Sequence, residues 1–189
     1  MGFKLETTFI KDLVVITPDI YEDERGFFIE SYRKDKFFEL GLDVEFVQDN
    51  HSKSVKNVIR GLHFQWLPPM GKLMRVTQGA AFVVAVDIRI GSPTFGQWHG
   101  IEASVNNRKQ VYAPAGFARG FCVLSDFAEI QYKCTGVYTS TGSESGILWN
   151  DPAIGIEWPV KKPILSRKDE NAQTLDRWLK REESKNFVY

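Results

Sequence analysis

Cysteine and histidine are scarce in this sequence. Its 189 residues include two cysteines, Cys122 and Cys134, and three histidines, His51, His63 and His99. Two thiols do not make a disulfide framework and no CxxC pair is present, so we expect both cysteines to be reduced core residues. The histidines lie far from one another along the chain, whereas a metal site needs clustered ligands. We therefore predict no metal site.

Long apolar runs and an excess of either charge are also missing. No apolar run approaches the roughly 18 residues of a membrane-spanning helix, and the first residues lack the apolar core of a secretory signal. The 24 basic and 24 acidic residues cancel, whereas nucleic-acid binders usually carry a basic excess. We therefore expect no membrane and no nucleic-acid partner, and a reducing cytoplasmic location.

The sequence does contain many short runs of β-forming residues. Aromatic residues make up 13% of the chain, and they favour strands. Turn signals separate the runs, for example at residues 68–69, 91–93 and 114–116. Short strands at this spacing are typical of an antiparallel sandwich or barrel rather than of βαβ units. The predicted strands are residues 13–17, 26–32, 44–48, 58–64, 73–78, 80–89, 97–103, 110–113, 120–124 and 129–137.

Helical patterns are few. Residues 34–40 end at Gly41, and glycine is common just after a helix C-terminus. Residues 174–183 carry apolar side chains at helical spacing and predict a C-terminal amphipathic helix. No repeat or flexible linker divides the chain. We predict a single domain over residues 1–189, in which residues 170–189 form a C-terminal helical extension.

His63 lies in a predicted strand beside small and polar residues. Strand alternation places it on the same face as Gly61 and Gln65, with Arg60 on the opposite face unless the strand bends. This face offers an imidazole with space beside it, and histidine takes up a proton near neutral pH. A lone histidine in a strand is more often a structural one, so the residues alone leave both interpretations open.

Other polar residues occupy predicted strands. Arg119 stands among small and apolar residues, where an unpaired charge is costly to bury, so it either pairs with a carboxylate or faces an anion. Tyr132 is either a core ring or an acid. Gln48 and Asn50 alternate onto one face and could read a sugar or a base. A phenol can deliver a proton and cations can hold an oxyanion or a phosphate, so this set suits a phosphorylated ligand.

Ten short motifs follow one another along the chain. They are Asp23-Glu24-Arg25-Gly26-Phe27-Phe28, Gln48-Asp49-Asn50-His51-Ser52, Arg60-Gly61-Leu62-His63-Phe64-Gln65, Gly71-Lys72-Leu73, Val86-Asp87-Ile88-Arg89, Pro114-Ala115-Gly116-Phe117-Ala118, Tyr132-Lys133, Trp149-Asn150-Asp151-Pro152, Trp158-Pro159 and Ser166-Arg167-Lys168-Asp169. In this order, over about residues 10–170, they resemble the dTDP-4-dehydrorhamnose 3,5-epimerase family. One motif alone is weak evidence, but ten in register are strong.

The resemblance implies a mainly β fold, a cupin-type antiparallel barrel (jelly roll) with a few short helices, one of them C-terminal. It implies a homodimer that needs no metal and no other cofactor. Its substrate would be a dTDP-4-keto-6-deoxyhexose, inverted at C3 and C5 to turn dTDP-4-dehydro-6-deoxyglucose into dTDP-4-dehydrorhamnose.

The resemblance also assigns the catalytic groups. Protons next to a ketone are removable because the charge left behind delocalises onto the keto oxygen. Inversion then needs a base on one face of the sugar and an acid on the other. By resemblance, His63 is the base, oriented by Asp169, and Tyr132 is the acid. A carboxylate beside an imidazole raises its basicity and fixes its tautomer.

Further positions match substrate contacts of the family. Lys72 would lie near the developing enolate oxygen, and the fork of Arg60 suits a diphosphate. Tyr138 matches an aromatic residue that stacks on thymine. The matched substrate-binding positions are Arg25, Glu30, Gln48, Asn50, Arg60, Lys72, Arg119, Tyr138, Glu144 and Lys168.

Two positions depart from the family's pattern. Arg119 stands where the family usually has histidine, and Val84 where it commonly has aspartate. Arginine is longer, always charged and unable to shuttle protons. A single-centre epimerase, acting at C3 or C5 alone on a related sugar nucleotide, therefore stays open as an alternative. A non-catalytic sugar-nucleotide-binding cupin is a second one, although a mere binder needs no opposed acid and base such as His63 and Tyr132.

Overall fold

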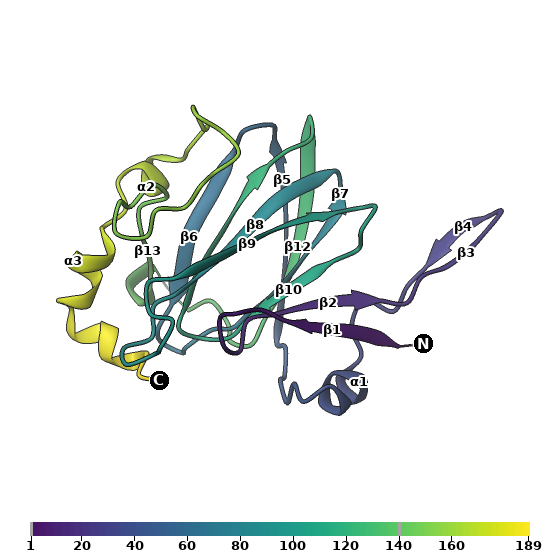
Figure 1. The fold of residues 1–189 in the computed structure, drawn as a ribbon, viewed down its shortest axis with the longest axis horizontal. Helices are drawn as coiled ribbons and strands as arrows, with labels where there is room; N and C mark the ends of the chain where they lie inside the picture. Colours follow the sequence, from purple (N-terminus) through teal and green to yellow (C-terminus); the bar gives the residue numbers. More distant parts are fainter. Residues whose placement is uncertain (1, 140) are drawn as a thin grey trace.

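A computed structural model describes residues 2–139 and 141–189 of the chain and consists mainly of antiparallel strands (Figure 1). The six-stranded sheet contains, in spatial order, β1 (Phe3–Thr7), β2 (Val14–Pro18), β10 (Gln110–Ala113), β7 (Lys72–Gln78), β12 (Phe127–Cys134) and β5 (Gln48–Val55). The five-stranded sheet contains β13 (Glu144–Gly146), β6 (Ile59–Gln65), β11 (Phe117–Val123), β8 (Ala80–Asp87) and β9 (Trp98–Ser104). This arrangement confirms the predicted mainly β fold with antiparallel pairing.

Apolar side chains fill the space between the two sheets. The apolar side chains form separate clusters on the two sides of the five-stranded sheet, and strand β8 contributes to both. Val83 and Ala85 belong to the inner cluster, whereas Val84 and Val86 belong to a second cluster on the other side of the five-stranded sheet. Because β8 is buried on both faces, its sequence is an almost continuous apolar run rather than an alternating one. Val84, one of the two departures from the family pattern, is fully buried in the outer cluster.

The C-terminal segment covers the outer face of the five-stranded sheet and is drawn in yellow in Figure 1. It contains α2 (Arg167–Glu170), α3 (Leu175–Leu179) and the 3₁₀ turn η2 (Glu182–Asn186). Trp178 is fully buried there, with its ring centroid 4.6 Å from that of Phe64. The segment therefore contributes to the core.

The C-terminal helix is shorter than predicted. The apolar spacing indicated residues 174–183, but the α-helix ends at Leu179. Arg181 has an extended backbone before η2 begins. Its guanidinium lies over the rings of Trp66 and Trp178, 5.3 and 5.7 Å from their centroids. A continuous helix would point the Arg181 side chain in another direction, and these two ring contacts would be lost.

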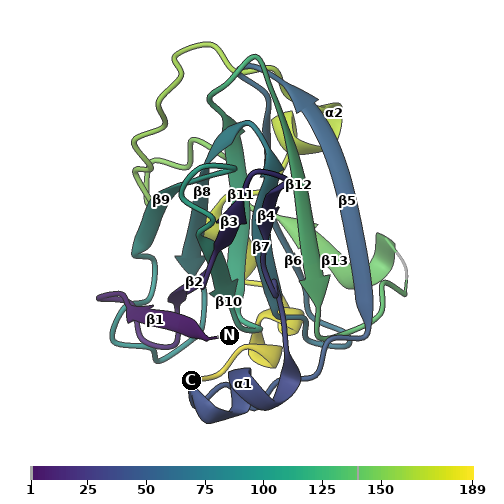
Figure 2. The same cartoon turned by 90° about the vertical axis from the view of Figure 1, so that its right-hand side faces the viewer.

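Helix α1 (Lys34–Glu39) closes the outer face of the six-stranded sheet and lies beneath β1 and β2 in both views (Figures 1 and 2). Its buried Phe37 belongs to an apolar cluster against which Val44 and Phe46 also pack. The prediction of a strand over residues 44–48 is therefore largely wrong, because residues 44–47 form an irregular segment that packs beside α1 and β5 begins at Gln48.

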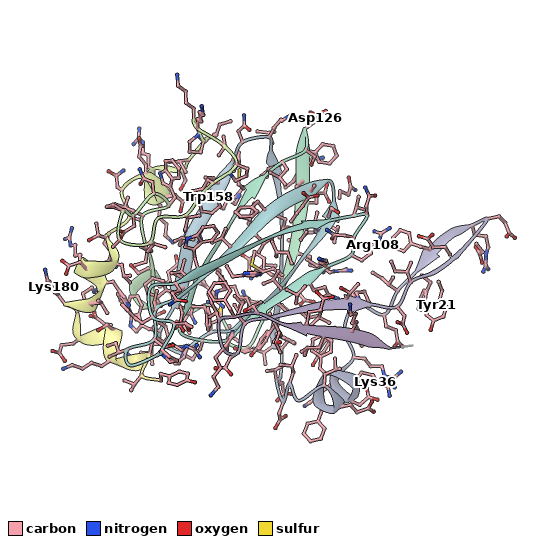
Figure 3. All side chains as sticks on the ribbon, viewed as in Figure 1. Tyr21, Lys36, Arg108, Asp126, Trp158 and Lys180 are labelled. Carbon is pink, nitrogen blue, oxygen red and sulfur yellow. The ribbon has the colours of Figure 1, made fainter. Side chains whose placement is uncertain are left out.

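A two-stranded arm projects from the body of the molecule (Figure 1). It consists of β3 (Tyr21–Asp23) and β4 (Gly26–Phe28), and all residues of both strands are exposed. The strand predicted over residues 26–32 is thus shorter and lies in the arm. Figure 3 shows Tyr21 on the arm and Arg108 at the adjoining edge of the body. The Arg108 guanidinium lies 3.8 Å from the ring centroid of Phe27.

Strand β6 is irregular at its centre. Arg119 of β11 pairs with His63, whereas Phe121 pairs with Arg60, so three steps on β6 match two on β11. The bulge lies at Gly61, whose φ is +139°, and a Cβ there would lie 2.6 Å from the Cα of Gly120. Glycine at these two positions lets the strands approach closely.

Within the two described ranges, no helix has the length and apolar character needed to cross a membrane.

Candidate functional site

A cavity of about 160 Å³ lies between the two sheets. Strands of both sheets contribute to its walls. The lining residues are Ser52 of β5, Arg60 and His63 of β6, Lys72 and Met74 of β7, Arg119, Gly120 and Phe121 of β11, and Tyr132 of β12. Five of the residues singled out in the sequence therefore meet here, although up to 72 positions separate them along the chain (Arg60 to Tyr132).

His63 is held by a buried carboxylate. Its Nε2 lies 2.5 Å from Oδ1 of Asp169, which belongs to α2 and is 3% exposed. Because Nε2–H donates to the carboxylate, Nδ1 is the ring nitrogen left to accept a proton. The predicted pairing of these two residues is present in the structure.

Ser166 holds the other oxygen of this carboxylate. Its hydroxyl donates to Oδ2 of Asp169 at 2.9 Å and accepts from the Asp169 backbone N–H at 3.1 Å. Burial alone would raise the pKa of Asp169, but the hydrogen bond and charge of His63 and the hydrogen bond from Ser166 together lower it below its usual value. Asp169 is thus an anion in a fixed orientation, and His63 inherits that orientation.

The bulge in β6 brings Arg60 into the same cavity as His63. Regular alternation would place the two residues on opposite faces, but the extra residue at Gly61 returns both to the inner side. The Nε of Arg60 donates to Oγ of Ser54 at 2.8 Å. Within the described residues no hydrogen bond occupies the terminal nitrogens of this guanidinium, so they can bind an anionic group.

Tyr132 and Lys72 form another part of the wall. The Lys72 Nζ lies 4.8 Å from the centroid of the Tyr132 ring. Burial is the main reason that the pKa of Tyr132 is raised, so its phenol stays protonated at neutral pH. Burial and then the charge of Arg119 lower the pKa of Lys72 to about 8.

Arg119 is 4% exposed and has no carboxylate partner within the parts of the chain that the structure describes. Its Nη1 donates to the carbonyl of Ala113 at 3.2 Å and its Nη2 to that of Met70 at 2.8 Å. Its Nε is buried and makes no hydrogen bond to any residue that the structure describes. Burial lowers its pKa to about 10, so the guanidinium is still charged at neutral pH. Of the two interpretations of Arg119, pairing with a carboxylate is therefore wrong.

A second group of predicted residues is linked by hydrogen bonds among its own members. Gln48 donates to Asn50 at 3.1 Å and accepts from the Tyr138 backbone N–H at 2.8 Å. Glu144 accepts from Tyr138 Oη at 3.4 Å and also from Lys168. The charges of Glu144 and Lys168 both act on the pKa of Lys72, which places them near the cavity.

Arg25 and Glu30 are not brought to this cavity. Arg25 sits at the tip of the arm and pairs with Asp23, and Glu30 lies 3.5 Å from Arg33. The arm points away from the sheets that enclose the cavity (Figure 1). Their assignment as substrate contacts stays a prediction.

Sequence reasoning missed several residues of the site. Ser52, Met74 and Phe121 line the cavity, and each lies two positions from a residue that was singled out. Ser166 did carry a signal, because a serine followed three residues later by an acidic residue is typical of a helix start. Both cysteines are free and buried, as predicted. Within residues 2–139 and 141–189, no three His, Cys, Asp or Glu residues gather in a metal-binding group.

The arrangement supports chemistry on a carbon acid. A carboxylate-oriented imidazole can take a proton, a neutral phenol can give one, and the nearby cations can stabilise the oxyanion that forms between the two steps. All three kinds of group line the same cavity.

Comparison with known proteins agrees with this chemistry. The profile of the dTDP-4-dehydrorhamnose 3,5-epimerase family matches residues 7–177. The dTDP-4-dehydrorhamnose 3,5-epimerase of Salmonella typhimurium is 55% identical over 175 residues, which are 91% of this chain and 95% of that protein. A dTDP-4-dehydrorhamnose 3-epimerase of Streptomyces niveus is 40% identical over 85% of this chain and 78% of that protein.

A solved structure supports the same relationship. The dTDP-6-deoxy-D-glucose-3,5-epimerase of Legionella pneumophila, in complex with dTDP-4-keto-L-rhamnose, superimposes with a TM-score of 0.91. It is 47% identical, and the match covers 97% of each chain.

Proposed function

Because this chain belongs to the dTDP-4-dehydrorhamnose 3,5-epimerase family, an isomerase family, we propose that His63, Asp169 and Tyr132 carry out the epimerisation in the cavity between its two sheets. The substrate is a dTDP-4-keto-6-deoxyhexose, and the reaction inverts C3 and C5. The observation that carries the proposal is the contact of 2.5 Å between His63 and the buried carboxylate of Asp169, in a cavity that Tyr132 also lines.

We assign a separate role in the reaction to each of these residues. Nδ1 of His63 removes the proton from the carbon next to the ketone, and Asp169 stabilises the imidazolium that results. The electron pair moves onto the keto oxygen, where the Lys72 ammonium supplies positive charge. Tyr132 then delivers its phenolic proton to the carbon from the other side, which inverts the centre. Arg60 has the guanidinium geometry that binds phosphate oxygens.

Incubation of the enzyme with the dTDP-4-keto-6-deoxyglucose substrate in D₂O tests the proposal. We expect deuterium at both C3 and C5, together with a product of inverted configuration at both carbons. An enzyme that binds the nucleotide sugar but introduces no deuterium would be the non-catalytic alternative.

A single-centre epimerase is the second candidate. Arg119 at the position of the family's usual histidine favours it, and one relative is named a 3-epimerase. In the same experiment, a single-centre enzyme introduces deuterium at C3 or C5 alone. The two candidates share the base, the acid and the cavity, so they differ only in which carbons exchange.

Ser166 provides a test of the orientation of Asp169. We expect Ser166→Ala to lower kcat by roughly 10–100-fold, the range seen when a group that orients a functional histidine is removed. Thr174→Ala is the matched control, because Thr174 caps α3 through the same kind of bond, to the Arg177 N–H at 3.2 Å, and this bond does not involve Asp169. Steady-state kinetics and thermal midpoints are measured for both variants. Equal losses of kcat in the two would mean that Ser166 matters only as a helix cap.

The pH dependence of kcat/KM should show the loss of the Lys72 charge. Burial and the Arg119 charge lower its pKa to about 8, so the cation is lost as pH rises through that value. We expect kcat/KM to fall above about pH 8, and Lys72→Arg to move this fall upward because arginine stays charged. A fall at the same pH in Lys72→Arg would assign the effect to another group.

Unfolding at high pH is not expected to cause this fall of kcat/KM above about pH 8. The folded chain releases the Lys72 proton near pH 8, whereas the unfolded chain holds it until about 10.4. Between these values the unfolded state binds more protons, so this group makes stability rise with pH. A thermal midpoint that is steady or rising over the same window separates the two causes.

We infer a homodimer in which the arm of one subunit reaches the cavity of the other. Support comes from its position, because the arm carries Arg25 away from its own cavity and exposes the rings of Tyr21, Phe27 and Phe28. Exposed rings of this kind are typical of an interface. A single domain of residues 1–189 and a cytoplasmic location complete the proposal.

Mixed dimers test the arm. Arg25→Ala and His63→Ala subunits are co-expressed with different tags and purified as the hybrid. If the arm crosses to the partner, one site of the hybrid keeps both residues, so activity returns to about half that of the wild type. If each arm serves its own subunit, the hybrid is no more active than the average of the two parents.

A further inference from the structure

Arg119 has a different set of contacts from the other cations of the cavity. Both terminal nitrogens of its guanidinium are bound to backbone carbonyls, those of Ala113 and Met70. Each terminal nitrogen therefore spends one of its two N–H groups on the backbone, which fixes the plane of the guanidinium. Within the described residues, the buried Nε makes no hydrogen bond.

The two carbonyls flank Lys72 on both sides. Met70 lies two residues before Lys72 on the same segment, and Ala113 is the ladder partner of Lys72 on the neighbouring strand β10. Arg119 approaches from β11, in the opposite sheet. Its guanidinium thus joins the start of β7, the end of β10 and the five-stranded sheet at the point where Lys72 enters the cavity.

We propose that Arg119 is a positioning residue, which acts on the reaction through Lys72 by holding the two backbone segments beside it and by placing a second cation next to it. The inference rests on the proposed function, since it assigns Lys72 to the enolate oxygen. It replaces the expectation that Arg119 itself binds the substrate. It also accounts for an arginine at a position where the family usually has histidine.

The charges around Lys72 support this role. Burial is the largest influence that lowers its pKa, and the charge of Arg119 comes second. Lys168 acts in the same direction, whereas Glu144 and the Cys134 thiol act in the opposite one. Tyr132 lies under the ammonium, and His63 and Arg60 line the same cavity from β6. Among these groups, Arg119 is the cation that is both buried and fixed at two points.

Three substitutions separate charge from position. Arg119→Lys keeps the positive charge but loses the two terminal nitrogens of the guanidinium. Arg119→Gln removes the charge and keeps one amide donor for a carbonyl. Arg119→His introduces the residue that the family usually has. In each variant we measure the Lys72 titration in the ligand-free protein by NMR of ¹⁵N-labelled lysine, assigned with Lys72→Arg, and then kcat and KM at pH 7.

If the charge of Arg119 acts on Lys72, the Lys72 titration should shift in the variants that lose this charge and stay in the variant that keeps it. We expect the midpoint of the Lys72 titration to rise by about one pH unit or more in Arg119→Gln and Arg119→His, the size that a nearby like charge commonly produces, and to stay near the wild-type value in Arg119→Lys. At pH 7 we expect kcat to fall by at least roughly tenfold in Arg119→Gln, because small displacements of a catalytic group cost this much or more, with KM changed less than about twofold.

Two outcomes would overturn the inference. An unchanged Lys72 titration in Arg119→Gln, in a variant with a cooperative thermal transition, would show that the two cations do not act on each other. A large rise in KM without any shift in the titration would show that Arg119 contacts the substrate directly. The titration needs no substrate, so its result stands apart from the proposed function, which fails instead if the wild-type enzyme introduces no deuterium into the sugar.

Discussion

Replacing His63 by alanine should abolish epimerisation while leaving nucleotide binding nearly intact. The imidazole is the only base that Asp169 orients toward the cavity within the described residues, and general base catalysis contributes roughly 10²–10⁴-fold. We therefore expect kcat to fall by at least this factor. The affinity for dTDP, measured by calorimetry, should change little because the contacts proposed for the nucleotide lie at other residues.

His51→Ala is the matched control for this variant. His51 is also a strand histidine next to a carboxylate, since its Nε2 lies 3.1 Å from Glu129, but its side chain is 54% exposed and outside the cavity. Its removal should leave kcat unchanged. Near-normal turnover by His63→Ala would show that another group is the base.

Tyr132→Phe should uncouple proton exchange from inversion. The substitution removes only the hydroxyl and keeps the ring that packs against the inner cluster, so stability should change little. Without the phenol, His63 can still take a proton and return it, or a deuteron from solvent, to the same face of the sugar. We expect inversion to fall by roughly 10²–10⁴-fold, while deuterium enters the recovered substrate at a rate that falls much less.

Product stereochemistry and deuterium content are measured together in this experiment. Tyr32→Phe serves as the control, because Tyr32 is a half-buried ring on the outer face of the six-stranded sheet. It should leave both rates unchanged. If exchange and inversion fell by the same factor in Tyr132→Phe, the phenol would not be the group that reprotonates the sugar.

The sequence predicted a strand best where a short, fully buried run lies between turn segments. Residues 110–113 match β10 at both ends, because these four residues are all buried between turn segments. Residues 44–48 failed for a physical reason. Val44 and Phe46 alternate like strand residues, but they satisfy that pattern by packing against the apolar cluster that contains Phe37 of α1 rather than by joining a sheet. An alternating pattern indicates which side chains are buried, but it does not indicate which part of the molecule they pack against.

The candidate site was less accessible to reasoning from the residues alone. His63 and Tyr132 were notable in their local sequence, but nothing local connected either of them to Asp169, which lies 106 positions after His63. That pairing came from the resemblance. The role of Arg119 was not visible in either way, because its partners are backbone carbonyls, and backbone groups leave no mark in a sequence.

The bulge at Gly61 sets the spacing between the side chains of Arg60 and His63 in the cavity. Two residues on one face of a regular strand are separated by roughly 7 or 13 Å, since each residue advances the chain by about 3.3 Å. Arg60 and His63 are three residues apart and still share a face, so they can hold an intermediate spacing that a regular strand does not offer. A sugar nucleotide has its own fixed spacing between the diphosphate and the carbons next to the ketone. The loss of one residue between Arg60 and His63 would restore regular alternation and keep both side chains on one face, but it would fix their spacing at roughly 7 Å, so this strand tolerates substitution far better than a change of length.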